Sequence, residues 1–342
     1  RTRLASFPRS IQVGTNWTCN LKCFFCRREL GDRERLAQLP ASDMEIPAAA
    51  MNRLMKVLPY VEIFTLTPLG EPLLYSGLPR LLAYYQTVGS KNLYLTTNGN
   101  VITDNRAKML VQSQVRRITI SIDSANPKRY AQMRVGGDLA KITEGLSRIE
   151  EWKRKLNSTL PEVIFASTFM QRNIGDLPGL IQYAHDNNVK SIGVQLMEAE
   201  SNEIEVETLK YHIPELTRVI EESERFATGM GVQLFIHDAI RNLLSAQAGP
   251  EAEAAELLKS RPDLDTRQKT LIEKCSFPWT FLVVDTDADV RPCCWAGASY
   301  GNLARQEFDE IWNGPTNIEM RREFLQNIIP DCCRGKHCRV DL

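Results

Sequence analysis

Short apolar runs alternate with amphipathic stretches along the first 200 residues. The runs are rich in β-branched and aromatic residues and predict strands over 11–17, 61–66, 91–96, 116–122, 162–169 and 190–197. Apolar residues at helical spacing between them predict helices near 47–58, 76–88, 102–114, 138–156 and 176–187, the last with Asp176 as a cap. Such alternation is typical of a parallel sheet with helices outside, which places its functional residues at the carboxyl ends of the strands.

The pattern changes after residue 200. A charged helix is predicted near 204–227 and a seventh strand over 232–237, and the Ala/Glu-rich stretch 246–270 indicates a helix or a connector. Residues 281–295 predict a β-hairpin that turns at Asp287-Ala288-Asp289, followed by two short helices around 306–327. We therefore expect a barrel domain over 1–240, a helical connector over 241–270 and a small α+β domain over 271–342.

Composition excludes several classes of protein. The 342 residues are 43% hydrophobic and 25% charged, which excludes disordered and fibrous architectures. Lys and Arg number 42 and Asp and Glu number 42, so the formal net charge is zero and no basic surface indicates nucleic acid or an anionic membrane. No apolar run resembles a signal peptide or reaches the length of a membrane span. We expect a cytoplasmic protein whose partner is small, or neutral to mixed in charge.

Cysteines are few but clustered. Nine cysteines are an odd number at low density, unlike a disulfide scaffold. Three form Cys19-x3-Cys23-x2-Cys26, and the other six are Cys275, Cys293, Cys294, Cys332, Cys333 and Cys338. This distribution indicates two separate sulfur-rich sites. Structural zinc prefers four ligands, whereas the first group offers three thiolates without a nearby His, which suits an iron-sulfur cluster with one open iron.

The first cysteine group lies directly after the first predicted strand. Its spacing, with aromatic Phe25 before the last Cys, resembles the motif of the radical S-adenosylmethionine (radical SAM) superfamily. The resemblance covers about residues 11–200 and implies a partial (β/α)6 TIM-type barrel, an α/β fold. It also implies that Cys19, Cys23 and Cys26 hold a [4Fe-4S] cluster whose fourth iron is chelated by SAM. Buried free cysteines or a zinc knuckle are the alternatives for the same spacing.

Further elements at strand ends continue this resemblance. Gly70-Glu71-Pro72 follows the second strand, as does the family element that receives the methionine amino group. Each short element alone is also an ordinary turn or cap signal, so their positions after successive strands carry the interpretation. The resemblance implies cofactor contacts from Phe25, Gly70, Glu71, Pro72, Thr97, Asn98, Ser121, Asp123 and, against adenine, Val194.

The C-terminal cysteines resemble a second family element. Cys275-x12-Ala288-x4-Cys293 is similar to the start of a SPASM or twitch extension, with Ala288 where the family has Gly; a nearby Asp can accept the turn conformation. Four thiolates per cluster and six cysteines imply one auxiliary [4Fe-4S] cluster. Its implied ligands are Cys275, Cys293, Cys338 and one of Cys332 or Cys333. An open auxiliary iron or a structural zinc are the alternatives.

The resemblance implies an oxidoreductase that cleaves SAM reductively to a 5′-deoxyadenosyl radical and takes a hydrogen atom from its substrate. We expect dehydrogenation or epimerisation of a polar small molecule such as a sugar or cyclitol, with flavodoxin or ferredoxin as electron donor. A maturase that modifies a peptide or protein is the alternative, and a non-catalytic iron-sulfur redox protein is the alternative of another class.

Substrate contacts are expected at strand ends, from Gln195, Glu198, His237 and Asp238. A lone His at such a position is more often structural than a base. Cys294 adjoins Cys293, and successive strand residues point to opposite faces, so we expect it to be a spare thiol. It is either a small buried hydrophobe or a hydrogen-atom donor in an epimerase.

Overall fold

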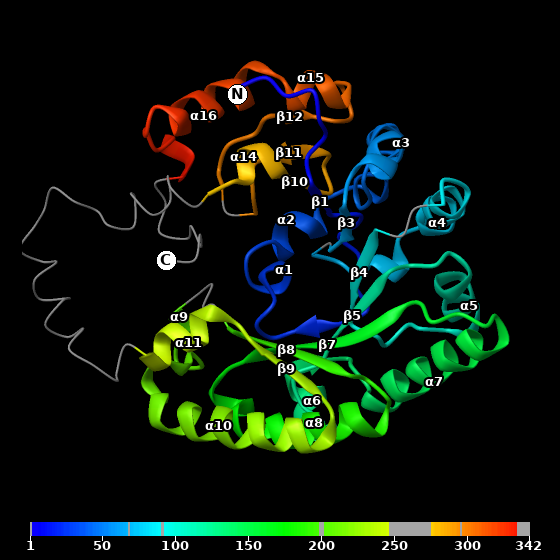
Figure 1. Cartoon of the computed structure of the whole chain (residues 1–342), viewed down its shortest axis with the longest axis vertical. Coiled ribbons are helices and arrows are strands. Elements are labelled where there is room, and N and C mark those ends of the chain that lie inside the picture. Colours follow the sequence, from blue (N-terminus) through cyan, green and yellow to red (C-terminus); the bar gives the residue numbers. More distant parts are fainter. Residues whose placement is uncertain are drawn as a thin grey trace, which may run out of the picture. The chain divides into compact units, whose positions relative to one another are not determined.

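A computed structural model describes residues 2–67, 69–89, 92–197, 202–245, 275–294 and 296–333 (Figure 1). The chain divides into two compact units. Unit 1 contains residues 1–17, 40–94 and 253–342, and unit 2 contains residues 18–39 and 95–252. The N-terminal segment is thus part of the same unit as the C-terminal region. No described helix is both long enough and apolar enough to cross a membrane.

Unit 1 is built on a sheet that mixes N-terminal and C-terminal strands. β1 (Ser10–Val13) pairs in parallel with β3 (Ile63–Leu66) on one side and with β10 (Phe281–Val284) on the other. β11 (Asp289–Arg291) and β12 (Gly301–Asn302) continue the sheet in antiparallel pairing. Its helices are α3 (Ala48–Val57), α4 (Leu78–Thr87), α14 (Phe277–Thr280), α15 (Phe308–Trp312) and α16 (Pro315–Leu325).

The hairpin expected in the C-terminal region is β10 and β11. Asp285 N–H donates to the carbonyl of Asp289 at 2.9 Å, which closes the turn. Ala288, not a neighbouring Asp, adopts the left-handed conformation, with φ of +67°, and its side chain is buried. The expectation that an Asp would take over the conformation of the family's Gly was therefore wrong, because the turn places Ala288 itself there.

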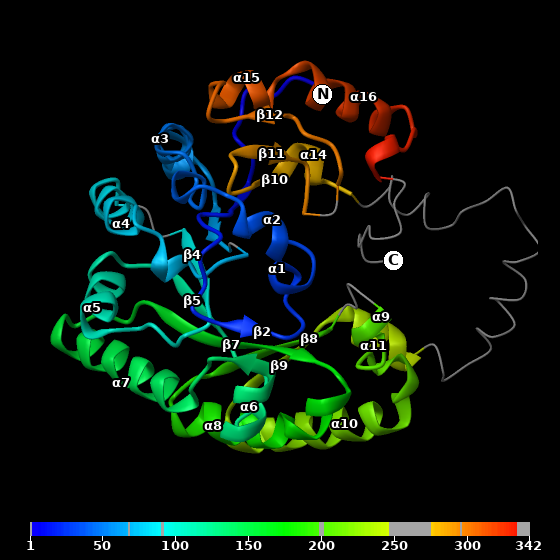
Figure 2. The same cartoon turned by 180° about the vertical axis from the view of Figure 1, so that it is seen from behind.

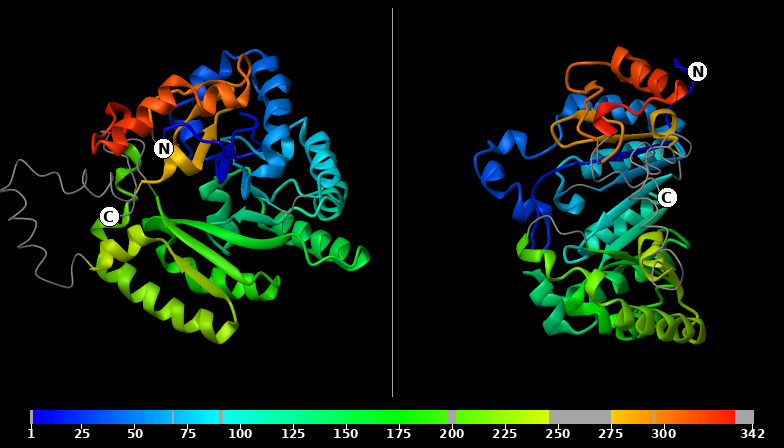
Figure 3. Two further views of the ribbon diagram at one scale, coloured as in Figure 1. Left: turned by 45° about the horizontal axis from the view of Figure 1, so that its top comes forward. Right: turned by 90° about the vertical axis from the view of Figure 1, so that its left-hand side faces the viewer.

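Unit 2 is a parallel sheet covered on one face by helices (Figures 2 and 3). β5 (Arg117–Ser121), β7 (Glu162–Phe169), β8 (Ser191–Leu196) and β9 (Gln233–Ile236) lie side by side in that order. β4 (Leu93–Thr97) runs from unit 1 into unit 2. The main helices are α5 (Asp104–Gln112), α7 (Leu139–Lys155), α8 (Leu177–Asp186) and α10 (Ile213–Met230).

Shorter elements of unit 2 lie at the ends of the strands. They are β2 (Lys22–Cys23), α1 (Arg27–Leu30), α2 (Arg33–Ala37), α6 (Pro127–Met133), β6 (Arg134–Val135), α9 (Asn202–Glu205) and α11 (Asp238–Ser245). The two-residue strands β2 and β6 pair antiparallel, with Cys23 opposite Arg134. This small ribbon brings the loop of the first cysteine group beside the segment that follows β5.

The predicted strand and helix order is confirmed, with local differences. The first strand ends at Val13 and not at residue 17. The helix expected near 204–227 is α10, preceded by the separate short helix α9. Asp176 stands at the start of α8 but does not cap it, because its carboxylate accepts from Ser124 and is ion-paired with Arg129.

Candidate functional site

The first cysteine group lies on a tight loop in unit 2. Cys23 is buried, and Cys19 and Cys26 are partly exposed. Cys26 N–H donates to the carbonyl of Cys23 at 3.1 Å, and Leu21 N–H donates to the Sγ of Cys19 at 3.4 Å. Burial raises the pKa of the Cys23 thiol to about 11, against the opposing effect of Arg134. Without a bound cation, this side chain is therefore a neutral thiol near pH 7.

Asn98 connects the turn after β4 to this loop. Its Nδ2 lies 3.8 Å from the Sγ of Cys19 and 2.9 Å from the Oδ1 of Asn20. The turn requires glycine at position 99, where φ is +75°. A Cβ at this position would lie only 3.0 Å from the Cγ2 atom of Ile120. Thr97 is buried and uses its hydroxyl to accept from Gly99 N–H at 3.1 Å. The sequence-predicted Asn98 is thus brought to the cysteine loop, and Thr97 stabilises the turn that carries it.

Arg134 is a site residue that the sequence did not reveal. Its Nη1 lies 3.8 Å from the Sγ of Cys23, and its Nε donates to the Oδ2 of Asp123 at 2.7 Å. The other oxygen of Asp123 accepts from Thr168 N–H at 2.8 Å. Burial lowers the pKa of Arg134, but Asp123, with smaller contributions from Cys23 and Tyr130, raises it by more, so the pKa lies above its ordinary value.

Asp123 has a structural role in this arrangement. Its side chain is fully buried, and its carboxylate oxygens accept from Arg134 and from Thr168 N–H, so it holds Arg134 in place; its contact with a cofactor stays a prediction. No motif marked Arg134 in the sequence, because it lies 111 residues from Cys23 and only sheet pairing brings the two together.

Gly70, Glu71 and Pro72 belong to unit 1. Glu71 is buried, and its Oε1 accepts from Leu73 N–H at 3.0 Å at the start of a short 3₁₀ turn. Asn16 binds this element twice: its Nδ2 donates to the carbonyl of Glu71 at 3.0 Å, and its carbonyl accepts from Gly70 N–H at 3.1 Å. The element is therefore fixed to the chain three residues before Cys19.

The unit 2 sheet has one covered face and one open face. Phe165, Ile192 and Val194 are buried on the covered face, where Phe165 stacks on Tyr183 of α8. Strand alternation places other residues on the opposite side, which we call the open face: Thr119, Ser121, Ala166, Thr168, Gly193, Gln195 and Phe235. These are half-buried or exposed, and Phe235 is 54% exposed.

Two sequence-predicted residues differ in their relation to the open face. Gln195 is exposed there, and its Nε2 donates to the Oγ1 of Thr168 at 3.2 Å. Val194 points the other way and is buried under the helices, so its expected packing against adenine is not supported by the face on which it lies. A one-residue difference along a strand decides between the two faces.

The remaining substrate candidates are near the end of β9. The Nδ1 of His237 accepts from Ala239 N–H at 3.1 Å, so this exposed imidazole caps α11, the structural alternative considered for it. Asp238 is exposed at the first position of the same helix. Glu198 lies outside the described residues.

A second group of cysteines gathers in unit 1 from three separate segments. The Sγ atoms of Cys332 and Cys333 lie 3.9 Å apart. The pKa of the Cys333 thiol is raised by its hydrogen bond to Cys332, by burial and by the neighbouring sulfurs of Cys293 and Cys275. Cys275, Cys293 and Cys332 are therefore each close enough to Cys333 to affect its thiol. Cys338 lies outside the described residues.

Cys294 differs from the expected buried hydrophobe. It is exposed, and it lies in a turn after β11 has ended at Arg291. The expectation that Cys293 and Cys294 point to opposite faces of a strand was therefore wrong in its premise. Although the residue as a whole is exposed, partial burial of its sulfur and the adjacent Cys293 raise the pKa of Cys294 to about 11. The thiol is thus protonated near pH 7.

Both cysteine groups fit iron-sulfur clusters by their donor sets. In the described part of the chain, no three His, Cys, Asp or Glu side chains converge to hold a single metal ion. A cubane does not require such convergence, because each thiolate binds a different iron. The N–H groups of Asn98 and Arg134 directed at sulfur are the contacts expected around such a cluster.

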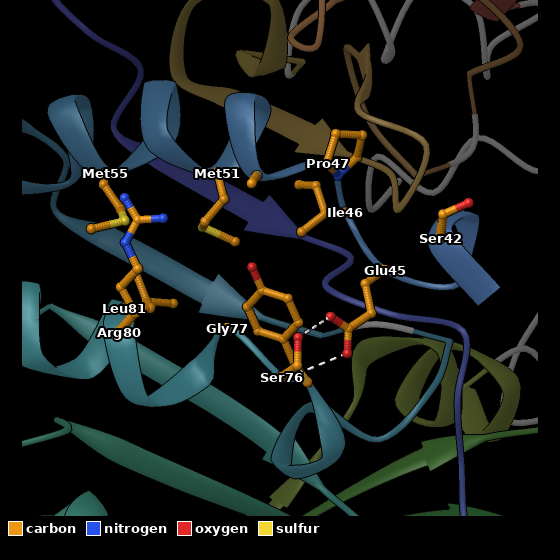
Figure 4. A pocket seen from close by; sticks show the side chains of 12 residues that line it. Ser42, Glu45, Ile46, Pro47, Met51, Met55, Ser76, Gly77, Arg80 and Leu81 are labelled. Atoms are coloured by element: carbon orange, nitrogen blue, oxygen red, sulfur yellow. Dashed lines mark hydrogen bonds between the residues drawn. The ribbon is translucent and has the colours of Figure 1, made fainter.

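Unit 1 also has a cavity of about 240 Å³ whose lining side chains bind one another (Figure 4). Ser76 N–H donates to the Oε1 of Glu45 at 2.8 Å, and the Ser76 hydroxyl donates to Oε2. Glu45 thus supplies the negative charge that the start of α4 favours. Burial, with a smaller contribution from Glu45, raises the pKa of Tyr75 in the same cavity. We assign the cavity no function.

Comparisons with known proteins agree with this geometry. The profile of the Radical SAM superfamily matches residues 18–159, and that of the SPASM iron-sulfur cluster-binding domain matches residues 275–339. A probable GTP 3′,8-cyclase of Methanococcus maripaludis strain C5 is 28% identical over 236 residues, which cover 69% of this chain and 73% of the relative. A GTP 3′,8-cyclase of Pelotomaculum thermopropionicum is 32% identical over 40% of this chain and 41% of its own length.

Solved structures share the fold. Streptococcus suis SuiB bound to S-adenosylmethionine has a TM-score of 0.65 at 16% identity, covering 93% of this chain and 68% of SuiB. Native anSMEcpe with bound AdoMet has a TM-score of 0.61 at 17% identity, covering 91% of this chain and 82% of anSMEcpe. The predicted fold, a partial TIM-type barrel with a small C-terminal α+β extension, is confirmed.

Proposed function

Because the chain belongs to the radical SAM superfamily and carries a C-terminal SPASM-type domain, we propose that it oxidises an uncharged polar substrate by hydrogen-atom abstraction. The family implies a [4Fe-4S] cluster with SAM, and the SPASM domain implies auxiliary iron-sulfur binding. Membership supports the class of chemistry. The kind of reaction and the substrate are our inference.

When bound, the SAM-bearing cluster supplies a 5′-deoxyadenosyl radical that takes a hydrogen atom, and the auxiliary cluster supplies an acceptor for the electron that the substrate radical releases. Cys19, Cys23 and Cys26 would hold the first cluster. Cys275, Cys293 and one of Cys332 or Cys333 would hold the second, with Cys338 as the fourth ligand. The flavodoxin or ferredoxin that would deliver the first electron is part of the proposal.

Residues of unit 2 stabilise the cysteine loop and connect it to the open face. Asn98 and Arg134 direct N–H groups at Cys19 and Cys23, which stabilises negative charge on the sulfurs. Asp123 keeps the guanidinium of Arg134 in place. Thr168 joins the two regions, since its N–H binds Asp123 and its hydroxyl accepts from Gln195 on the open face.

The proposed class of substrate is inferred from the side chains of the open face. Toward the carboxyl ends of the strands, its described members in unit 2 are hydroxyl, amide and apolar side chains without a charge, as in Ser121, Thr168, Gln195 and Phe235. Such a surface favours an uncharged polar molecule over a triphosphate, whose charges require cationic partners. A hydroxyl-bearing carbon that loses a hydrogen atom, an electron and a proton becomes a carbonyl, with the proton released to water.

A peptide substrate is the second candidate. Phe235 is 54% exposed and pairs in register with Gly193. A Cβ added to Gly193 would have one neighbour within 4 Å among the described residues, the carbonyl oxygen of Phe165 at 3.9 Å. This free space next to an aromatic ring can accept an amino-acid side chain. One of the structural neighbours was solved as SuiB bound to precursor peptide SuiA, which fits the same reading.

The test is formation of 5′-deoxyadenosine by the anaerobically reconstituted protein with SAM and dithionite. A protein with intact clusters that forms none contradicts the proposal. Cyclitols, glycosides and peptides are then compared by how much each accelerates this formation. With an accepted substrate, Cys275→Ser should retain 5′-deoxyadenosine and lose the oxidised product, while equal loss of both would assign the second cysteine group a structural role.

A further inference from the structure

We propose that Arg172, held by Glu207, positions the cysteine loop by packing its guanidinium on Phe24. Phe24 lies between Cys23 and Cys26, so its placement determines how the two thiols are presented. The effect on SAM binding rests on the proposed function, whereas the effect of Arg172 on the position of the loop does not.

The loop rests on an apolar floor made by the residues directly after β7 and β8 and by residues of α6 and α9. Phe24 and Phe25 pack against four buried side chains, Met133, Met170, Met197 and Ile204. Three of the four are methionines, whose flexible side chains adapt to neighbours but do not fix one orientation. Phe24 and Phe25 meet edge to face with ring centroids 5.3 Å apart. A floor of this kind leaves the exact position of the loop to other contacts.

Arg172 supplies such a contact. Its Cζ lies 3.9 Å from the centroid of the Phe24 ring, within the range of a cation–π interaction. Among the described residues, the one hydrogen bond of Phe24 runs from its backbone N–H to the carbonyl of Met133, at 3.3 Å, and leaves the ring free to turn. The guanidinium therefore limits the rotation of the ring.

Glu207 makes the guanidinium itself rigid. Arg172 donates to the Oε1 of Glu207 through Nε, at 2.9 Å, and through Nη2. Its backbone N–H faces Oε2 at 3.4 Å, and Gln171 N–H donates to the carbonyl of Glu207 at 2.9 Å. Two donors in a fixed fork hold the planar group more firmly than a single contact would. The ion pair thus ties the segment after β7 to the segment after α9, beneath the loop.

Arg172 is separable from the cluster chemistry. The Cζ of Arg134, which also contacts Cys23, lies 5.5 Å from the centroid of the Phe25 ring. The side chain of Arg172 instead contacts Phe24 and Glu207 within the described part of the chain. A change at Arg172 therefore acts through Phe24, as expected of a positioning residue.

The chain offers a matched control. Arg129 is ion-paired with Asp176 in the same unit, and the side-chain exposures of that pair, 39% and 14%, are nearly those of Arg172 and Glu207, 40% and 11%. Arg129→Met therefore removes a similar ion pair without removing a contact to Phe24.

The first measurement is hydrogen–deuterium exchange of the metal-free protein. Amides of residues 21–27 should exchange about fivefold faster in Arg172→Met than in Arg129→Met, because losing a cation–π contact loosens the loop locally. The second is the change that SAM causes in the electron paramagnetic resonance spectrum of the reduced, reconstituted protein. The SAM concentration for half of this change should rise about fivefold in Arg172→Met and stay unchanged in Arg129→Met.

A double variant distinguishes positioning through the ring from general stabilisation. In a Phe24→Leu background, Arg172→Met should have no further effect on either measurement, since the ring on which it acts is gone. Effects that persist in that background, or equal behaviour of Arg172→Met and Arg129→Met, would overturn the inference. A wild-type spectrum that SAM does not change would contradict the proposed function instead, and the exchange experiment would still decide the role of Arg172.

Discussion

Arg134 directs a guanidinium N–H at the Sγ of Cys23, 3.8 Å away. Arg134 is buried, and a buried charge without a partner is unfavourable. The contact exists because Asp123 is buried beside it and neutralises the guanidinium. A thiolate cluster gains negative charge on reduction, and N–H groups near sulfur favour that state. The ion pair therefore has both a structural and an electrostatic consequence.

Arg134→Met should destabilise the metal-free protein by about 3–5 kcal/mol, because it leaves the Asp123 carboxylate buried and unpaired. The double variant Arg134→Met/Asp123→Leu should lose less than the single variant, since it removes both charges. Urea unfolding of the wild type, Arg134→Met, Asp123→Leu and the double variant measures this. A double variant that loses the sum of the two single effects would show that the pair does not act as a unit.

Glu207 should make stability depend on acid pH. The hydrogen bond from Arg172 holds the pKa of this carboxyl below its ordinary value of 4.5. Its contribution is therefore fully present above that value and is lost as pH falls through the lower pKa of the folded protein. Glu207→Gln should cost about 1 kcal/mol at pH 7, and the difference from wild type should shrink below pH 4.5.

Thermal melts of both proteins at several pH values measure the Glu207 effect. Glu144→Gln, which breaks an exposed pair with Arg148, is the control and should change stability little at any of them. A constant difference between wild type and Glu207→Gln across the acid range would contradict the assignment.

Ala288→Gly should change stability by less than about 1 kcal/mol. A left-handed conformation costs a residue with a Cβ about 1–2 kcal/mol, while the added freedom of Gly in the unfolded chain costs about 0.5–1 kcal/mol. With φ of +67° at Ala288 the strain relieved is offset by this freedom and by the loss of a buried methyl, worth about 0.8 kcal/mol. Chemical denaturation measures it, and a loss of more than about 1.5 kcal/mol would show that Ala288 carries no strain.

Iron content should separate the two cysteine groups. Anaerobic reconstitution should give about eight irons per chain, and Cys19, Cys23 and Cys26 replaced together by Ala should leave about half. Iron and acid-labile sulfide assays, with circular dichroism to confirm folding, measure this. A folded triple variant that retains all the iron or loses all of it would contradict two independent sites.

Cys294 decides between oxidation and epimerisation. Its protonated thiol can donate a hydrogen atom, but oxidation has no use for one. With oxidation, the product carries no deuterium from deuterated buffer, and Cys294→Ala leaves it unchanged. Deuterium in the wild-type product, replaced in Cys294→Ala by an oxidised species, would instead establish epimerisation. Mass spectrometry of the product, after iron content is matched, distinguishes the two.

The sequence by itself determined the elements and the chemistry that each carries. Hydrophobic periodicity placed the parallel strands, and the spacing of Cys19, Cys23 and Cys26 indicated a three-thiolate site at the end of the first one. Both signals are local, because a strand or a loop of ligands is specified within a few residues. The hairpin before Cys293 was predictable for the same reason, from its turn residues.

Only the tertiary structure decided which side chains meet. Val194 and Gln195 are neighbours in sequence, yet one is buried and the other lies on the open face, because the helices cover a single side of β8. Arg134 reaches Cys23, and Arg172 reaches Phe24, across more than 100 residues of chain. Such contacts depend on strand order and register, which no local pattern encodes, since the same periodicity is compatible with many pairings.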